Sequence, residues 1–233
     1  MPNNQPIALV TGATSGIGTA IVRELATTHR IVALGRDEAR LAGVEAETRL
    51  AVDLRDSAAF APGGAVAELV ASLPRLDALV HSAAVGTPGA FDEADADEWH
   101  RQFDTNVIAP ALLTRLALPL LRASQGTVVF LGSGVSVRPA QQMSVYTATK
   151  HALKGLADSL RLEESGAGVR VTTIMPGQVD TPMQVELQAG LGNPYAPERY
   201  LRPESVAGAV RYAVAAPADA LVTDLSIRPR SAG

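Results

Sequence analysis

The chain contains no cysteine, which excludes disulfide bonds, zinc–thiolate sites and a cysteine nucleophile. It has no basic excess: its formal net charge is −4, whereas a nucleic-acid-binding domain usually presents a basic face. No apolar run reaches the roughly 18 residues that a membrane-spanning helix needs. Residues 1–6 lack the basic start and apolar core of a signal peptide. We therefore expect a cytoplasmic protein with no nucleic-acid partner, no membrane segment and no metal site.

What the sequence does contain is an alternation of short apolar runs and helical periodicity, without repeats or a low-complexity linker. With 233 residues, 47% of them apolar, the chain can bury roughly 70–75% of its unfolded surface. We expect a single α/β domain over residues 1–233, a doubly wound parallel sheet of about seven strands with helices on both faces. Strands are predicted at 7–11, 31–35, 48–54, 76–81, 126–131, 168–177 and 221–227, and helices at 19–26, within 58–73, at 95–121, at 146–165 and from 203.

Three glycines, Gly12, Gly16 and Gly18, lie between the first predicted strand and the first predicted helix. Glycine lets backbone N–H groups approach a pyrophosphate, and the N-terminus of the helix adds partial positive charge. Their spacing is G-x-x-x-G-x-G, which differs from the usual G-x-G-x-x-G fingerprint. The pattern favours a dinucleotide-phosphate site, and the alternative is a tight turn that only packs helix on strand.

The tip of the second strand, Gly35-Arg36-Asp37, is where an adenosine ribose would be recognised. Gly35 leaves room and the Arg36 guanidinium suits a 2′-phosphate, so NADP(H) is expected in preference to NAD(H). Asp37 could either neutralise Arg36 or cap the next helix. Asp53 ends the third strand, where it could meet the adenine amino group or cap the following helix.

Tyr146 and Lys150 stand four residues apart at the start of an amphipathic segment. On a helix these positions share a face about 5–6 Å apart, so an ammonium could lie beside a phenol. A free tyrosine titrates near pKa ~10, and a nearby cation lowers such a value by ~1–3 units. This spacing predicts a tyrosine acid–base catalyst, and the alternative is an exposed helix with an ordinary tyrosine and lysine.

Two further polar residues interrupt apolar segments. Ser133 lies between glycines at the end of the fifth predicted strand, and Asn106 breaks the apolar face of the helix over 95–121. Pro110 cannot donate a hydrogen bond to the carbonyl of residue 106. We expect a kinked helix whose free carbonyl either holds a water or has only a structural role.

Residues 182–202 show no clean periodicity and are rich in proline and glycine, which is typical of a lid or binding loop. An apolar pocket is predicted, because most of the large side chains in and near this loop are apolar. They are Met183, Val185, Leu187, Leu191, Tyr195 and Tyr200, together with Val135, Val137 and Met143. The glutamines at 141, 142, 184 and 188 could orient a polar substituent of a substrate.

In order and spacing, these motifs resemble the short-chain dehydrogenase/reductase family over essentially the whole chain. Thr11-Gly12-x-x-x-Gly16-x-Gly18 is similar to its cofactor motif, and Tyr146-x-x-x-Lys150 to its active-site motif. Asn106 resembles its helix asparagine, and Ser133 its catalytic serine. Pro176-Gly177-x-Val179-x-Thr181 is similar to the segment that flanks the nicotinamide carboxamide. The resemblance implies a Rossmann-type fold and four catalytic residues: Asn106, Ser133, Tyr146 and Lys150.

The resemblance also implies a cofactor site that draws on loops along the whole chain. Its expected members are Gly12, Thr14, Ser15, Gly16, Ile17, Gly18, Gly35, Arg36, Asp53, Leu54, Ser82, Ala83, Ala84, Tyr146, Lys150, Pro176, Gly177, Val179 and Thr181. The chain departs from the family in three places. His81-Ser82-Ala83-Ala84 replaces the usual Asn-Asn-Ala-Gly, Met175 replaces an asparagine, and the Asp-Gly-Gly of many members is missing near the C-terminus.

The chemistry that follows is hydride transfer between a nicotinamide and a carbonyl or secondary alcohol, with Tyr146 as proton donor or acceptor. Ser133 would hold the substrate oxygen, Lys150 the cofactor ribose, and Asn106 a water linking Lys150 to solvent. The expected partners are a small-molecule carbonyl or alcohol and further copies of the chain, as a homodimer or homotetramer through the helices at 99–121 and 146–165. The alternatives are a non-catalytic NADP(H)-sensing protein of the same fold and a methyltransferase with a similar sheet.

Overall fold

The computed structural model describes residues 5–230. Its sheet has seven parallel strands in the order β3-β2-β1-β4-β5-β6-β7. The strands are β1 (Ile7–Thr11), β2 (Arg30–Gly35), β3 (Thr48–Ala51), β4 (Ala78–His81), β5 (Thr127–Leu131), β6 (Arg170–Pro176) and β7 (Asp224–Ile227). The chain reverses its direction of travel across the sheet between β1 and β4, and in such sheets ligands bind in the crevice outside the carboxyl ends of the strands at that point.

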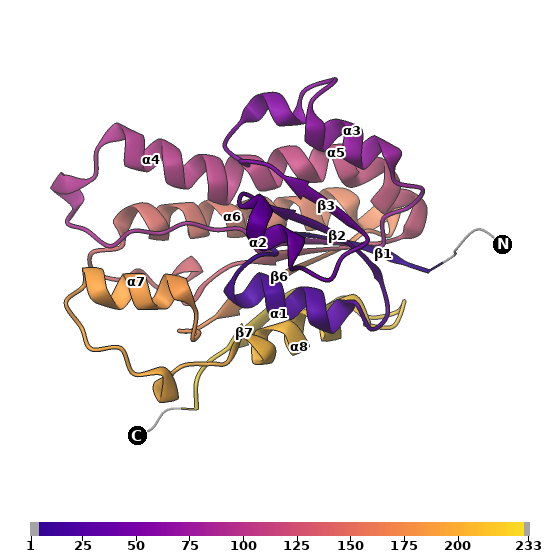
Figure 1. Cartoon of the computed structure of the whole chain (residues 1–233). Helices are drawn as coiled ribbons and strands as arrows, with labels where there is room; N and C mark the ends of the chain where they lie inside the picture. Colours follow the sequence, from indigo (N-terminus) through magenta and orange to yellow (C-terminus); the bar gives the residue numbers. More distant parts are fainter. Residues whose placement is uncertain (1–4, 231–233) are drawn as a thin grey trace.

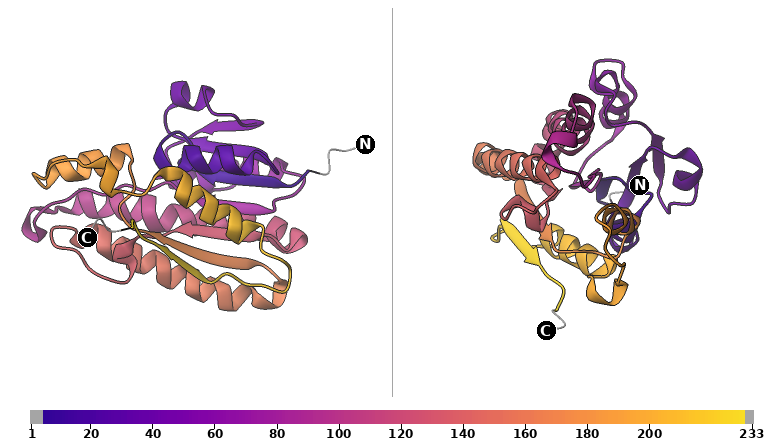
Figure 2. Two further views of the ribbon diagram at one scale, coloured as in Figure 1. Left: turned by 90° about the horizontal axis from the view of Figure 1, so that it is seen from below. Right: turned by 90° about the vertical axis from the view of Figure 1, so that its left-hand side faces the viewer.

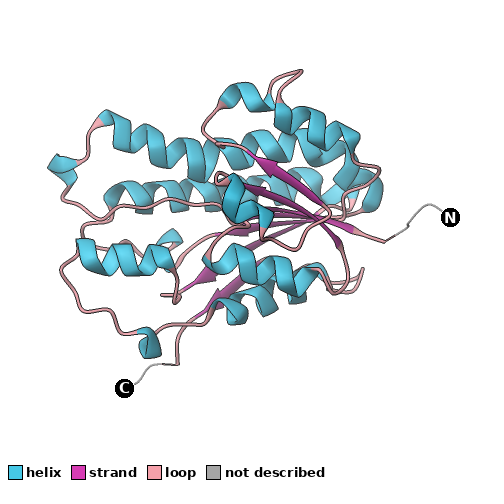
Figure 3. Cartoon of the chain, in the orientation of Figure 1, coloured by secondary structure: helices cyan, strands magenta, loops and turns pink. Residues whose placement is uncertain are grey.

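Helices cover both faces of the sheet (Figure 1, Figure 3). They are α1 (Gly16–Leu25), α2 (Glu38–Ala42), α3 (Ala65–Ser72), α4 (Ala96–Phe103), α5 (Ala109–Ser124), α6 (Ser144–Glu164), α7 (Pro182–Gly190) and α8 (Pro203–Val214). On one face α1 and α8 pack side by side over a core that includes Val10, Ile21 and Val206. On the other face α3, α5 and α6 enclose a second core around Phe130 and Leu113.

The central strands are buried along their whole length, which is why they read as continuous apolar runs. The doubly wound α/β fold and the seven predicted strands are confirmed, with boundaries that differ by up to three residues. Two helices differ from the sequence expectation. The short helix α2 was not predicted, and the 182–202 segment, expected to lack regular structure, contains the nine-residue helix α7, capped by Thr181, whose side chain accepts from Gln184 N.

The long helix predicted over 95–121 is divided into α4, a π-helical turn at Asp104–Ile108, and α5. Pro110 lies directly after that turn, at the first positions of α5. The continuous run Ala96–Ser124 is long and apolar enough by composition to cross a membrane, and 33% of its apolar window is buried. Its buried residues, such as Leu113 and Leu121, pack in the core of this face, so the composition also fits a helix that covers a sheet.

The loops that follow the strands gather at one edge of the sheet, on the left of Figure 1, together with α7. The right-hand view of Figure 2 looks onto this edge. The residues proposed from the sequence to carry chemistry lie at the ends of strands, in these loops or in the first two turns of the helices that follow them, apart from Asn106 in the π-helical turn. The candidate site is therefore at the carboxyl edge.

Candidate active site and cofactor site

Ser133 and Tyr146 come from the loop after β5 and the first turn of α6, and their side chains meet at the carboxyl edge. Ser133 follows the end of β5 and caps a short 3-10 helix at Gly134–Ser136, with its Oγ 3.4 Å from Val135 N. The Ser133 hydroxyl is near enough to the Tyr146 phenol to lower its pKa. The structure thus brings together the two hydroxyl groups that the sequence placed in one site.

Lys150 lies one helical turn beyond Tyr146, as the spacing predicted. Its Nζ is 5.6 Å from the centre of the Tyr146 ring and donates to the Leu131 carbonyl at 2.8 Å. Only 2% of Lys150 is exposed, and this burial lowers its pKa to about 8. The ammonium is therefore held between the end of β5 and α6, close to the tyrosine ring.

The pKa of Tyr146 does not move in the direction expected from the sequence. Burial raises it to about 12, and the Ser133 hydroxyl lowers it by less than burial raises it. Desolvation penalises a phenolate, and here that penalty outweighs the effect of the Ser133 hydroxyl. The expectation of an acidified phenol is wrong for the protein as described, in which Tyr146 is a neutral hydroxyl at pH 7.

Asn106 lies in the π-helical turn, where Ala109 N donates to Asp104 O across five residues. Its side-chain amide is fully used. Oδ1 accepts from Val85 N at 2.9 Å, while Nδ2 donates to Val85 O at 2.8 Å and to Thr149 Oγ1 at 3.1 Å. Thr149 Oγ1 also lies 2.8 Å from the Tyr146 carbonyl. The side-chain amide of Asn106 thus ties the loop after β4 to the start of α6. A water bound to the backbone carbonyl of Asn106 stays a prediction.

Thr149 and Gly86 are two site residues that sequence reasoning missed. A Cβ atom at Gly86 would lie 2.8 Å from Cδ2 of Tyr146, so this glycine lets the backbone of the β4 loop lie against the phenol ring. Thr149 is one position before Lys150 and was hidden inside the Y-x-x-x-K spacing. Neither residue has a sequence signal of its own, because both roles depend on a contact between distant segments.

The glycine turn after β1 has the geometry that its spacing predicted. Gly12 and Gly16 have φ values of +67° and +50°, which side chains other than glycine rarely adopt. A Cβ at Gly12 would lie 2.8 Å from Ala83 Cα, and one at Gly18 would collide with Gly12 O. Thr11 Oγ1 accepts from Ser82 N and Ala83 N at 3.2 and 3.1 Å. The turn is thereby fixed against the Ser82–Ala84 loop, although Gly12, Gly16 and Gly18 each have a packing reason as well.

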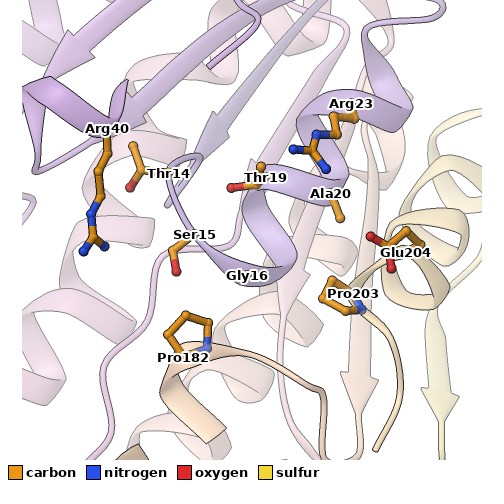
Figure 4. A pocket seen from close by; sticks show the side chains of 10 residues that line it. All are labelled: Thr14, Ser15, Gly16, Thr19, Ala20, Arg23, Arg40, Pro182, Pro203 and Glu204. Carbon is orange, nitrogen blue, oxygen red and sulfur yellow. The ribbon is translucent and has the colours of Figure 1, made fainter. Parts of the chain in front are cut away.

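A cavity of about 450 Å³ lies beside this turn (Figure 4). Its polar lining consists of three hydroxyl groups, two guanidinium groups and one carboxylate. Its lining residues are Thr14, Ser15, Gly16, Thr19, Ala20, Arg23, Arg40, Pro182, Pro203 and Glu204. Ser15 makes no side-chain cap to α1, and the first turn of α1 carries no acidic residue. The start of α1 therefore presents N–H groups without a side-chain cap, which fits the pyrophosphate of a dinucleotide, while the one carboxylate that lines the cavity, Glu204, comes from α8.

At the tip of β2 the structure changes part of the expectation. A Cβ at Gly35 would lie 2.7 Å from Thr14 Cγ2, so Gly35 lets the glycine turn pack on β2 rather than leaving room for a phosphate. Asp37 caps α2 by accepting from Arg40 N at 3.0 Å, which settles the alternative left open for it. Arg36 is exposed, and Arg40, which the sequence analysis missed, lines the cavity.

Asp53 accepts from the Arg55 side chain at 2.6 Å and from Arg55 N at 3.0 Å. Hydrogen bonds from Arg55 lower its pKa, with a smaller effect from the charge of Arg36. It does not cap the following helix: Asp56 does so, accepting from Ala58 N. The helix-capping alternative for Asp53 is wrong, and Leu54 beside it is half-buried at the edge of the core.

The segment after β6 closes the site from a third side. Pro176 ends β6, Gly177 N donates to Ile227 O at 2.7 Å, and Val179 pairs with Leu201 in an isolated bridge. A Cβ at Gly16 would lie 2.9 Å from Thr181 Cγ2. The 176–181 segment therefore borders the glycine turn. Among residues 5–230 no group of three or more histidine, aspartate or glutamate side chains could hold a metal ion.

Comparison with known proteins agrees with this geometry. Residues 6–192 match the short chain dehydrogenase family. An uncharacterized oxidoreductase of Staphylococcus saprophyticus is 32% identical over 232 residues, covering 96% of this chain and 97% of that protein. A metagenomic short-chain oxidoreductase solved in complex with NADP is 29% identical with a TM-score of 0.80, and covers 97% of both chains.

A 3-ketoacyl-(acyl-carrier-protein) reductase from Brucella melitensis, complexed with NADH, has the same fold, with a TM-score of 0.85 at 23% identity and 97% coverage of both chains. Solved structures similar to this chain therefore include complexes with each of the two dinucleotides. The match over most of the chain, together with the site geometry, shows that this protein is an oxidoreductase of the short-chain dehydrogenase family.

Proposed function

We propose that this protein is an NADP(H)-dependent oxidoreductase that interconverts a ketone or aldehyde and the corresponding alcohol. The observation that carries the proposal is the convergence of Ser133, Tyr146 and Lys150 at the carboxyl edge, beside the glycine turn. A nicotinamide, when bound, supplies or accepts the hydride. The remaining chemistry belongs to side chains of this chain.

Tyr146 transfers the proton at the substrate oxygen. A phenol whose pKa lies near 12 is protonated at pH 7, so in this environment Tyr146 is ready to donate rather than to accept. Ser133, whose hydroxyl influences the pKa of Tyr146, is placed to donate to the same substrate oxygen and to hold it near the phenol. In this state Tyr146 carries the proton that carbonyl reduction requires.

Lys150 and Asn106 support that proton transfer. With a pKa of about 8, Lys150 is mostly charged at pH 7, and its ammonium can bind the ribose hydroxyls of the cofactor while facing the tyrosine ring. Asn106 keeps the β4 loop and α6 in register through Val85 and Thr149. In this proposal its backbone carbonyl also holds the water that links Lys150 to solvent.

The residues present fit a dinucleotide phosphate, and a 2′-phosphate is supported by two guanidinium groups near the tip of β2. Arg36 follows Gly35 directly and is exposed, and Arg40 lines the cavity beside Thr14 and Ser15. A guanidinium binds phosphate oxygens through charge-assisted, often paired hydrogen bonds. We therefore assign NADP(H) as the preferred cofactor, with NAD(H) as the weaker one.

Replacement of the phenolic hydroxyl tests the proposed reaction. Tyr146→Phe removes the proton donor but keeps the ring against Gly86, so NADPH binding should persist while turnover falls by several orders of magnitude. The measurement is NADPH oxidation in the presence of a panel of carbonyl compounds, with NADPH affinity determined separately by fluorescence. Wild-type turnover in this variant would reject the assignment. NADPH binding by the unmodified protein without turnover of any carbonyl would instead favour the sensing function.

A further inference from the structure

Arg228 is the first residue after β7, and it lies at the carboxyl edge of the sheet because β7 runs parallel to β6 (Figure 1). Pro229 follows it and disfavours a helical backbone at Arg228. This is the stretch in which the chain lacks the Asp-Gly-Gly of many family members. The chain therefore places a guanidinium group near the loops that form the site.

The Arg228 side chain crosses the end of β6 and reaches the turn that holds Ser133. Its Cδ lies 3.4 Å from the position of a Cβ on Gly177, in the segment after β6. Its Nη1 donates to the Met175 carbonyl at 2.9 Å. The atoms Nη1, Cζ and Nη2 lie 3.4, 3.5 and 3.5 Å from the position of a Cβ on Gly134, the residue after Ser133. Because these three distances are nearly equal, the guanidinium lies face-on against Gly134.

This guanidinium has no carboxylate partner among residues 5–230. Within that range Arg228 forms no ion pair, and its hydrogen-bond acceptors are the backbone carbonyls of Met175 and Ile227, both through Nη1. By contrast, Arg55 and Arg122 each hold a carboxylate through two nitrogens. Arg228 is exposed, so Nε and Nη2 are open to a ligand from solution.

A guanidinium held in this way is preorganised for a carboxylate. Its planar pair of N–H donors matches the two carboxylate oxygens. The bond to Met175 and the contact with Gly134 already restrict the side chain, so binding an anion costs less side-chain entropy. Gly134 and Ser133 are neighbours in the chain, which places the guanidinium carbon at most about 9 Å from Ser133 Cα. A short-chain compound spans such a distance.

We propose that Arg228 binds a carboxylate of the substrate, and that the substrate is a short oxo acid or the corresponding hydroxy acid, a role that rests on the proposed function. Ser133 and Tyr146 hold the reacting oxygen while Arg228 pairs with the carboxylate at the other end of the molecule. The apolar ketone expected from the sequence is thereby replaced by an anionic compound.

Pairs of ketones that have nearly the same shape but differ in charge test the role of Arg228. Acetoacetate is matched by methyl isobutyl ketone, and levulinate by methyl isoamyl ketone, because an isopropyl group resembles a carboxylate in shape. With NADPH, the wild-type protein should show the higher kcat/KM for the acid in at least one pair. Arg228→Gln should lower kcat/KM for that acid about 10–100-fold, as for a lost charge-assisted hydrogen bond, and change that for its ketone by less than about threefold.

Two further variants separate the paired donors from the charge. Arg228→Lys keeps the positive charge without the planar fork and should retain part of the preference for the acid. Arg230→Gln removes the same charge from an exposed position two residues further on and should keep the wild-type preference. Equal losses for acid and ketone in Arg228→Gln would show that the guanidinium only supports the Ser133 turn, and would overturn the proposal. So would a wild-type protein that turns over the ketones as well as the acids.

The failure of the proposed function gives a different result. In that case none of the four probes is turned over, and their stabilisation of the protein against thermal unfolding is measured in the presence of NADPH. An acid that stabilises the wild type more than its ketone does, with the difference lost in Arg228→Gln, would retain the carboxylate site and reject only the reaction. Equal stabilisation by both members of each pair, or none by any probe, would overturn the role of Arg228.

Discussion

The ammonium of Lys150 is buried and Tyr146 is partly buried, and burial shifts the pKa values of both toward the uncharged forms. The tyrosine rises to about 12 and the lysine falls to about 8. The spacing of the two residues correctly indicated that they are neighbours, but a spacing carries no information about solvent. Because desolvation depends on what the rest of the chain places around a group, its cost could not be read from Y-x-x-x-K.

His81 shows the same effect at a position where the chain departs from its family. It is 3% exposed, its Nε2 is 2.8 Å from Thr114 Oγ1, and its ring stacks on Phe130 with centroids 4.9 Å apart. Burial lowers its pKa to about 3 from 6.5. The side chain is thus a neutral member of the core below the β4 loop.

This burial predicts a loss of stability in mild acid. Below pH 6.5 the unfolded chain binds a proton at His81 that the folded protein does not bind until about pH 3. The free energy of unfolding should therefore decrease as the pH is lowered from 6.5 to about 3. His81 alone contributes up to about 1.4 kcal/mol per pH unit to this decrease. Urea unfolding at a series of pH values measures the slope. His81→Asn should flatten the slope between pH 6 and 4; an unchanged slope would show that other groups cause it.

Arg36 provides a residue-scale prediction for the cofactor. Arg36→Ala should lower kcat/KM for NADPH by about 10–100-fold, as for a lost charge-assisted hydrogen bond, and change that for NADH by less than about threefold. The two cofactors differ only in the 2′-phosphate, so NADH serves as an internal control in the same preparation. Equal losses with both cofactors would place Arg36 outside the phosphate site. Arg40→Ala, tested in parallel, determines whether the second guanidinium contributes.

Among the elements, the loop after β4 connects all the parts of the site. Its Ser82 and Ala83 N–H groups bind Thr11, its Val85 backbone binds Asn106, and its Gly86 lies against Tyr146. A methyl group at position 86 would lie 2.8 Å from Cδ2 of the Tyr146 ring, which is closer than Cβ atoms normally approach another atom. The ring or the loop must therefore move if Gly86 gains a side chain.

Gly86→Ala should reduce kcat at least tenfold with a stability loss of about 1–3 kcal/mol, as is typical of overpacking. Steady-state kinetics and thermal unfolding measure the two effects. Gly208→Ala is the matched control, because nothing lies within 4 Å of a Cβ built at that position in α8. It should keep full activity and gain about 0.5–1 kcal/mol of helix stability. Unchanged kcat in Gly86→Ala would mean that the phenol does not need its present position.

Strands and helices were predictable to different degrees for physical reasons. β1, β4 and β5 are buried on both faces, so each appears as an apolar run that ends at a glycine or a polar loop. The helix α7 has an inward face of glutamines, which cancels the apolar periodicity that identifies a helix. Asn106 was correctly recognised as an interruption, but the π-helical turn and the bond to Thr149 depend on two segments 43 residues apart.

At the scale of the whole molecule, the layer formed by α4, α5 and α6 exposes apolar surface. Ile108, at the end of the π-helical turn, is 45% exposed, and Leu162 near the end of α6 is 78% exposed. Contiguous exposed apolar patches on proteins often mark interfaces. We therefore expect the outer faces of α5 and α6 to form the contact of a homodimer or homotetramer, the assembly expected from the family resemblance.

Sedimentation of the protein at micromolar concentration tests this expectation. The wild type should sediment as a dimer or tetramer, since an apolar face of this kind is stabilised by burial against a second copy. Leu162→Glu places a charge on that face and should shift the population toward smaller species. Val185→Glu, at an exposed position on α7 at the carboxyl edge, should leave the assembly unchanged. A monomeric wild type would contradict this expectation. So would a Leu162→Glu variant whose assembly has the same mass as that of the wild type, because Leu162 on α6 would then lie outside the contact between copies.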